Sequence, residues 1–207
     1  MAKMIRILCV DDHPLMRDGI AFALQSQKDM ELVGQAVNGE EALRLFRELR
    51  PDVTLMDLQM PGMNGIAAIE RIRAEFPKAR IVVLTTYSGD VLASRALKAG
   101  VVGYLLKGML RTELIGTIRT VHDGGRRIPP EVASEVAEHL SADALSEREI
   151  EVLRCVAKGN ANKIVADELS ISEDTVKGHM KNILSKLRAN DRTHAVLIAM
   201  KRGFLDS

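Results

Sequence analysis

The stretch Val53-Thr-Leu-Met-Asp-Leu-Gln-Met-Pro-Gly-Met-Asn-Gly65 joins a short apolar run to an acid, Asp57, and then to a turn rich in Pro and Gly. The apolar run has the length and composition of a buried strand. An ionised carboxylate is costly to bury unless a cation or hydrogen-bond donors meet it. Asp57, at the inner end of such a strand, therefore needs a partner or has a chemical role.

Apolar runs of this kind recur along the first part of the chain, and each is followed by a segment of helical periodicity. Runs that are apolar on both sides and alternate with helices are typical of a parallel sheet covered on both faces. Asn38 and Glu41 have the spacing of a capping box, and Pro77 closes the third helix, which supports this division. The sequence predicts an α/β sandwich with strands at Ile5–Val10, Leu32–Val37, Val53–Met56, Ile81–Thr85 and Val101–Leu106.

The composition is that of an ordinary soluble globular protein, since 46% of the 207 residues are hydrophobic and 28% are charged. Cys9 and Cys155 lie far apart within apolar patterns, so we interpret them as core thiols, which favours a reducing, cytoplasmic location. The run Ile5–Val10 is too short for a signal peptide. No segment has the length to cross a bilayer, so no membrane partner is expected.

The strand pattern ends near Asp123-Gly124-Gly125, and from Ser146 onward every segment has helical periodicity. We therefore predict an α/β domain at residues 1–125 and a small all-α domain of four helices at residues 144–207. Residues 126–143 form the linker between them, with a short amphipathic helix at Glu131–Leu140.

Polar side chains follow the predicted strands at the edge where ligands of open parallel sheets bind. Asp11, Asp12 and Asp57 are expected at this edge. Three carboxylates so close would repel one another unless a divalent cation neutralised them, and Mg²⁺ prefers such ligands. A carboxylate beside that cation can attack a phosphoryl group and carry it as an acyl phosphate, while a lysine compensates the added charge. Any one of these residues alone could be an ordinary solvated strand-end residue, but together they favour a phosphoryl site. The set comprises Asp11, Asp12, Asp57, Thr85, Thr86 and Lys107, with the adjacent His13 interpreted as a helix-start residue.

The helical part begins with Ser146 and Glu149, which have the spacing of a capping box. The helix that follows is expected to end near Lys158, and a second, short helix is predicted from about Asn162 to Leu169. The tight turn Ser170-Ile171-Ser172 leads from it into a third helix. Two helices around such a turn form a helix-turn-helix.

The third of these helices has one apolar face and one polar or cationic face. From Thr175 to Arg202 there are seven Lys or Arg and one acid, in a chain whose net charge is only +1. A charge run is more often a solvated helix face, but the preceding turn favours entry into a DNA major groove, with phosphates supplying the affinity. The predicted buried residues are Val176, Met180, Ile183, Leu184 and Leu187, and those that project elsewhere are Lys177, Gly178, Lys181, Asn182, Ser185 and Arg188.

Four segments of the first domain resemble the signature positions of a response-regulator receiver domain, and the resemblance covers residues 1–125. It implies a flavodoxin-like, doubly wound parallel sheet of five strands in the order 2-1-3-4-5. The segments are Val10-Asp11-Asp12-His13, Met56-Asp57-Leu58-Gln59-Met60-Pro61-Gly62-Met63-Asn64-Gly65, Leu84-Thr85-Thr86 and Gly103-Tyr104-Leu105-Leu106-Lys107.

The receiver resemblance also implies a role for each signature residue. Asp57 would accept a phosphoryl group from a sensor histidine kinase. Mg²⁺ would be held by Asp12, Asp57 and the backbone carbonyl of Gln59, with Asp11 helping through water. Thr85 would turn toward the phosphoryl group, Tyr104 would change rotamer with it, and Lys107 would pair with a phosphoryl oxygen.

The helical domain resembles the LuxR-type helix-turn-helix of the NarL/FixJ response regulators. The resemblance rests on Leu145-Ser146-x-Arg148-Glu149-x-Glu151-Val152-Leu153, Asn162-Lys163, Ile171-Ser172-x-x-Thr175-Val176-Lys177-x-His179, Lys186-Leu187 and Arg192. It implies that Lys177 and Lys181 contact DNA and that the last helix, Arg192 to Arg202, forms a dimer interface. Together with the polar face, the predicted DNA-binding residues are Thr175, Lys177, Gly178, Lys181, Asn182 and Arg188.

Two departures from the family pattern concern this helical domain. Ile164 stands where the family usually carries an acid, and Gly178 occupies a base-facing position while weakening the helix by roughly 1 kcal/mol relative to alanine. The preferred DNA sequence is therefore expected to differ from that of relatives.

The combined resemblance implies a two-component transcriptional regulator that binds paired DNA half-sites as a homodimer, with RNA polymerase as a further candidate partner. One alternative is a Mg²⁺-dependent phosphatase with an aspartyl-phosphate intermediate. Such enzymes usually carry a second acid two residues after the nucleophile, where Gln59 stands here. Another alternative is a regulator that binds DNA without phosphorylation, but such receivers usually lack one of the acids or the lysine.

Overall fold

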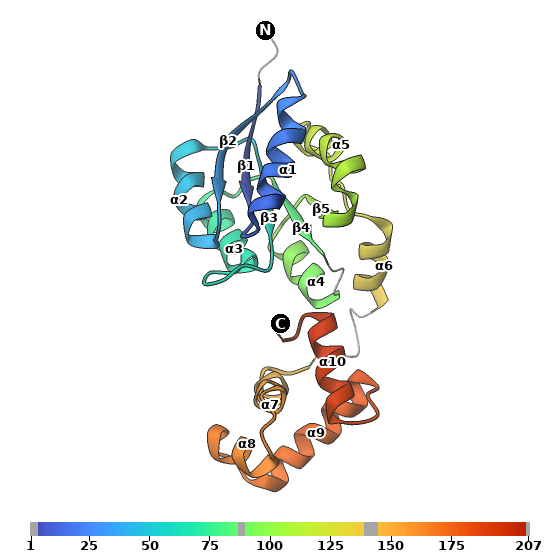
Figure 1. The fold of residues 1–207 in the computed structure, drawn as a ribbon. Helices are drawn as coiled ribbons and strands as arrows, with labels where there is room; N and C mark the ends of the chain where they lie inside the picture. The colour runs from blue at the N-terminus through green and yellow to red at the C-terminus, as the bar shows by residue number, and fades with distance from the viewer. Residues whose placement is uncertain (1–3, 87–89, 139–144, 206–207) are drawn as a thin grey trace. The chain divides into compact units, whose positions relative to one another are not determined.

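The computed structural model describes residues 4–86, 90–138 and 145–205 (Figure 1). The chain divides into two compact units, an α/β unit and a helical unit, and the division after α5 (Leu110–His122) falls between Ala133 and Ser134. This point lies inside the predicted linker, whose residues 139–143 are outside the described part of the chain.

The α/β unit contains a five-stranded parallel sheet in the order β2-β1-β3-β4-β5, which confirms the predicted fold. Two strands differ from prediction at their first residue. The second begins at the buried Met30 rather than at Leu32, and the fifth is confined to four residues. The strands are β1 (Ile5–Val10), β2 (Met30–Ala36), β3 (Val53–Asp57), β4 (Ile81–Thr85) and β5 (Gly103–Leu106).

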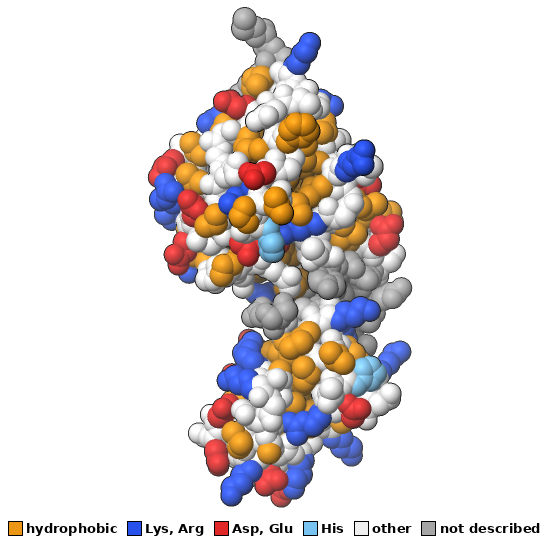
Figure 2. Space-filling view, in the orientation of Figure 1, with side chains coloured by type: hydrophobic (Ala, Val, Ile, Leu, Met, Phe, Trp, Pro, Cys, Tyr) orange, Lys and Arg blue, Asp and Glu red, His pale blue; other side chains and the backbone are white. Residues whose placement is uncertain are grey.

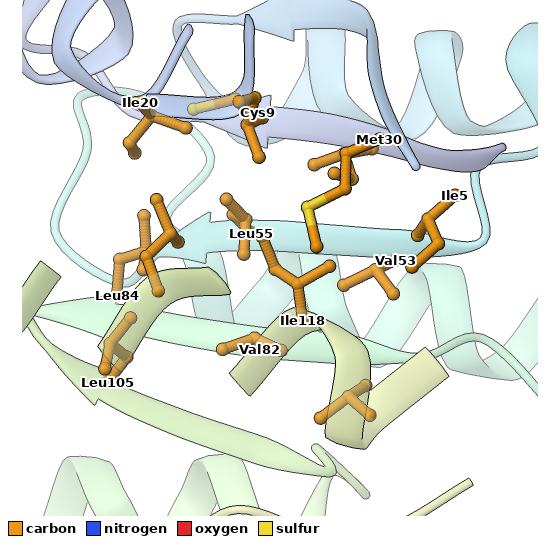
Figure 3. Close-up of a cluster of buried hydrophobic side chains, with 14 residues drawn as sticks. Ile5, Cys9, Ile20, Met30, Val53, Leu55, Val82, Leu84, Leu105 and Ile118 are labelled. Carbon is orange, nitrogen blue, oxygen red and sulfur yellow. The ribbon is translucent and has the colours of Figure 1, made fainter. Parts of the chain in front are cut away.

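Helices cover both faces of this sheet (Figure 1), as expected for strands that are apolar on both sides. On one face α1 and α5 pack against the strands, and Figure 3 shows Ile20 of α1 and Ile118 of α5 directed toward Leu55 and Val82. The opposite face is covered by the other three helices. The helices of the unit are α1 (Pro14–Gln25), α2 (Gly39–Leu49), α3 (Gly65–Glu75), α4 (Asp90–Lys98) and α5 (Leu110–His122), with a 3₁₀ turn, η1 (Lys107–Met109), before α5.

The chain leaves α5 along the free edge of β5. The Arg127 N–H donates to the Val102 carbonyl at 3.0 Å, and the Tyr104 N–H donates to the Arg127 carbonyl at 2.8 Å. These bonds form a parallel bridge between Arg127 and Gly103. The start of the predicted linker is therefore bonded to the sheet, and α6 (Pro130–Glu138) follows at once in place of the predicted Glu131–Leu140, whose last two residues are not described.

The helical unit has the four predicted helices. Ser146 caps the first in a complete capping box with Glu149, as expected. Ser170 adopts a left-handed conformation at the end of the second helix, and Ser172 caps the third by accepting the Thr175 N–H at 3.0 Å. The helices are α7 (Glu147–Ala157), α8 (Asn162–Leu169), α9 (Glu173–Leu187) and α10 (Arg192–Arg202).

The core of the helical unit joins all four helices through apolar side chains such as Val152, Val165, Ile183 and Ala199. Glu149 is buried beside this core, and its carboxylate accepts a hydrogen bond from Lys186 of α9 at 2.7 Å. Among the described residues of the whole chain, no helix is both long and apolar enough to cross a membrane.

Candidate functional site

The parallel register brings the carboxyl ends of β1, β3 and β5 to one edge of the sheet. Asp11 follows β1, Asp57 ends β3, and Lys107 follows β5. The Lys107 Nζ lies 2.7 Å from Asp57 Oδ2 and 2.8 Å from Asp11 Oδ2. Both carboxylates are buried, so Lys107 supplies the cation that their burial requires.

The turn after β3 passes so close to Asp57 that only glycine fits at position 65. A Cβ added to Gly65 would lie 2.0 Å from the Asp57 carbonyl oxygen and 2.8 Å from the Leu58 Cα. Gly62, earlier in the same turn, has a φ of 73°, in the region that favours glycine. The Pro- and Gly-rich segment therefore folds back tightly and leaves the Asp57 side chain at the sheet edge.

Asp12 and His13 complete the cluster around Asp11 and Asp57. Each of the four residues offers one ligand atom, and these atoms all lie within 4.8 Å of one another. Asp12 is partly open to solvent, with 29% of its side chain exposed, and the exposed His13 ring lies 2.8 Å from it. An acidic cluster of this composition could hold a metal ion.

Burial raises the pKa of Asp57 above its ordinary value, and the hydrogen bond and charge of Lys107 offset only part of this effect. Burial also acts to lower the pKa of Lys107, but its bonds to Asp11 and Asp57 outweigh burial and raise that pKa. Lys107 is therefore held as a cation, while the ionised form of Asp57 is disfavoured in the folded chain.

The exposed face of α9 is the second candidate site, and it carries the residues predicted to contact DNA. Thr175, Lys177, Gly178, Lys181 and Asn182 are all exposed. The opposite face is buried as predicted, except that Leu184 is only partly buried. The Lys177 Nζ is 3.0 Å from Asp174 Oδ1, so one of the two central lysines has an acidic partner within the helix.

Arg188, the last predicted DNA contact, lies just beyond α9. It is exposed and forms the C-cap in a left-handed conformation with a φ of 51°. Figure 2 shows Lys and Arg side chains at several places on the helical unit, interspersed with Asp and Glu. The positive charge is therefore not a continuous stripe in this view. The candidate site on α9 is identified by which residues the helix exposes as much as by their charge.

Comparison with known proteins gives matches for both units. A family described as "Response regulator receiver domain" matches residues 7–119, and one described as "Bacterial regulatory proteins, luxR family" matches residues 143–199. The transcriptional regulatory protein LiaR of Bacillus subtilis (strain 168) is 41% identical, covering 98% of this chain and all of its own length.

The chain belongs to the NarL/FixJ family of response regulators. It is a two-component transcription regulator with a receiver and a LuxR-type DNA-binding domain, and not a conventional enzyme.

Solved structures of other response regulators have the same architecture. ChrA, the response regulator of a heme-sensing two-component system, is 34% identical and covers 99% of this chain and all of its own, with a TM-score of 0.59. RcsB from Salmonella enterica serovar Typhimurium, bound to a promoter with the phosphomimetic BeF₃⁻, is 26% identical and has a TM-score of 0.73. That match covers 95% of this response regulator and 98% of the RcsB chain.

The remaining receiver signature residues lie in or just after β3, β4 and β5. Thr85 is buried at the end of β4, whereas Thr86 is exposed. Tyr104 is fully buried in β5. The Gln59 N–H donates to Asp57 Oδ1 at 3.2 Å, so the residue predicted to offer a carbonyl to Mg²⁺ also orients the carboxylate.

Two contacts in the response regulator were not predicted from its sequence. His13 is at the N-cap of α1, as expected of a helix-start residue, but it makes no side-chain cap, and its ring lies against the acids. Arg17 donates to the Asp11 carbonyl at 2.7 Å. In the sequence, only the position of Arg17 one turn into α1 could have indicated this hydrogen bond, and an arginine there is usually an ordinary surface residue.

Proposed function

We propose that Asp57 accepts a phosphoryl group from a sensor histidine kinase and that this modification controls DNA binding by the helical domain. The observation that carries the proposal is the contact of one partly buried lysine, Lys107, with both Asp57 and Asp11 at 2.7 and 2.8 Å. An arrangement that only balanced charge would need one carboxylate for one cation. The cluster has more carboxylates than lysines, and a further cation bound there would supply the positive charge that phosphoryl transfer needs.

In the proposed reaction an Asp57 carboxylate oxygen attacks phosphorus in a phosphohistidine or a small acyl phosphate. The new bond joins that oxygen to phosphorus, while the bond to the imidazole nitrogen or the acyl oxygen breaks, and that group leaves with the electron pair. Lys107 is already within hydrogen-bond distance of Oδ2, so it can stabilise charge on the transferred group. The Gln59 N–H holds Oδ1 and limits rotation of the carboxylate.

The donor set fits Mg²⁺, because carboxylate oxygens are its preferred ligands and the partly exposed Asp12 leaves room for its water shell. Asp12, Asp57 and the Gln59 carbonyl would hold the ion, with Asp11 acting through water. When bound, Mg²⁺ would neutralise phosphoryl and carboxylate charge. This role is consistent with a cluster in which burial already disfavours ionised Asp57.

The proposed response to phosphorylation involves Thr85 and Tyr104. Thr85 would turn its hydroxyl toward the phosphoryl group, and the buried Tyr104 would change rotamer in the space this creates. DNA binding would then change through release of the helical domain or through dimerisation of the receiver.

The DNA-binding part of the proposal assigns the exposed face of α9 to the major groove and expects a homodimer on paired half-sites. Lys177, Lys181 and Arg188 would contact phosphates. Thr175 and Asn182 have short side chains, so they would contact only DNA groups that lie close to the helix. One solved structure of RcsB contains two RcsB dimers bound to two parallel DNAs, which supports the assignment by analogy.

The test compares DNA binding by the full chain before and after treatment with acetyl phosphate and Mg²⁺, using duplexes selected from a random pool. Treatment should increase affinity for the selected duplexes at least several-fold in the unaltered chain, and Asp57→Asn should show no increase. An equal increase in the Asp57→Asn variant would contradict the assignment of Asp57.

A further inference from the structure

Gly178 lies in the interior of α9 and is exposed, yet nothing in the described part of the chain requires a glycine there. A Cβ added at this position would meet no atom within 4 Å. Gly178 is also absent from the glycines with a positive φ, so its backbone has no conformation that would exclude a side chain. Glycine weakens a helix interior. The missing side chain therefore either serves a contact with a binding partner or has no role.

The position of Gly178 on the helix points to the first explanation. Asp174 and Asn182 lie one turn before and after it, and Thr175 and Lys181 lie three residues away on the same face. All four are exposed. Gly178 is therefore the centre of the surface that α9 presents, and at that centre the helix offers bare backbone surrounded by polar side chains.

We propose that Gly178 is a specificity-determining residue whose missing side chain leaves room for the methyl group of a thymine. The inference rests on the proposed entry of α9 into the major groove. A helix with its side chains is about 10–12 Å across and the groove is about 12 Å wide, so one missing side chain lets the helix axis lie deeper.

The chemistry of the base edges selects thymine. Every base presents hydrogen-bond donors or acceptors in the major groove, including O4 of thymine, and these lose free energy if buried without a partner, but thymine alone adds an apolar methyl group there. Gly178 has no side chain to pair with them. The thymine methyl needs no hydrogen bond, and it can contact the Cα of Gly178 between the side chains of Thr175 and Lys181.

The test uses the full chain and a duplex selected by the unaltered protein from a random pool. Each thymine of the selected site is replaced in turn by deoxyuridine, which lacks only the methyl group. At one position per half-site this change should weaken binding by the unaltered chain several-fold. Gly178→Ala should bind the thymine duplex about tenfold more weakly and recover most of that loss on the deoxyuridine duplex, because the alanine methyl fills the vacated space.

Gly116 provides the matched control. It lies inside α5, is exposed, and a Cβ there would also meet nothing within 4 Å. Gly116→Ala and Gly178→Ala should both raise the midpoint of thermal unfolding by about 4 °C. Only Gly178→Ala should change DNA recognition, and this separates a groove contact from a general effect of helix stability.

Three outcomes would overturn the inference. The selected site could contain no thymine, or Gly178→Ala could bind every thymine and deoxyuridine duplex with the same relative affinities as the unaltered chain. In both cases a selected motif exists, so the proposed function stands and the role of Gly178 fails. If the unaltered chain selects no motif at all, the proposed DNA recognition fails and the inference fails with it.

Discussion

Asp57→Asn should stabilise the receiver at neutral pH, although it removes the proposed phosphorylation site. The Asp57 side chain is only 4% exposed, and burial raises its pKa above the ordinary value of 3.8. An acid with a raised pKa in the folded state favours folding below its ordinary pKa. That contribution is lost as the pH rises through the raised pKa, so the ionised carboxylate costs stability at pH 7.

The size of the effect follows from the contacts of Lys107. An asparagine keeps an oxygen that Lys107 can still contact, while the cost of burying a charge is removed. Lys107 also keeps its contact with Asp11 at 2.8 Å, so it is not left without a carboxylate partner. We expect a gain of about 1 kcal/mol, or roughly 3–6 °C in the unfolding midpoint of a domain of this size.

Tyrosine fluorescence gives a direct assay, because the chain has no tryptophan and both tyrosines, Tyr87 and Tyr104, belong to the receiver. The midpoint difference between Asp57→Asn and the unaltered chain should be largest near pH 7 and vanish below pH 3.8. Mg²⁺ should narrow the difference at pH 7, because a cation that binds only the folded state stabilises it in proportion to its occupancy.

Asp29→Asn is the matched control with the opposite sign. Its hydrogen bond from Arg119 lowers the pKa of Asp29, so its ionised form favours folding and the asparagine variant should be slightly less stable at pH 7. A lower midpoint for Asp57→Asn at pH 7 without Mg²⁺, or a stabilisation that does not change with pH, would refute the electrostatic reasoning.

The remaining predictions concern the other parts of the chain. Lys186→Met should destabilise the helical unit by about 1–3 kcal/mol, since it leaves the buried Glu149 carboxylate without its cation; thermal unfolding followed by circular dichroism measures this. Burial acts to raise the pKa of Glu149, but its hydrogen bonds, with that from Lys186 foremost, lower this pKa below the ordinary value of 4.5. The loss of stability in Lys186→Met should therefore be present above pH 4.5 and disappear as the pH falls, and a loss that does not depend on pH would contradict this prediction. Lys177→Ala and Lys181→Ala should each reduce the slope of log K against log salt for DNA binding by about 1, and unchanged slopes would argue against groove placement. Arg127→Pro removes the donor to the Val102 carbonyl and should increase amide hydrogen exchange in β5 about tenfold; unchanged exchange would mean that this bridge does not hold the chain to the sheet.

The receiver fold and its acid cluster were predictable because both depend on simple periodic patterns. Strands that alternate with helices are parallel, and parallel strands bring residues such as Asp11, Asp57 and Lys107 to one edge whatever the details of packing. The glycine at position 65 was also predictable as part of a tight turn. Its contact with the Asp57 carbonyl follows from how closely that turn passes the strand.

Other features depend on tertiary contacts that have no local signal. The pairing of Arg127 with β5 requires an open sheet edge, and the sequence Gly-Gly-Arg-Arg that ends at Arg127 has the composition of a loop. The sharing of Lys107 between two carboxylates is a matter of distances that no spacing encodes. The early start of β2 follows from the burial of Met30, whose environment comes from the neighbouring elements.

Intact mass measurement shows most simply whether Asp57 is the phosphoryl acceptor. The full chain and Asp57→Asn would be incubated with a small acyl phosphate, each with and without Mg²⁺. With Mg²⁺ the unaltered chain should gain the mass of one phosphoryl group, and the variant should gain none. An equal increase in Asp57→Asn, or one that is independent of Mg²⁺, would contradict the proposal.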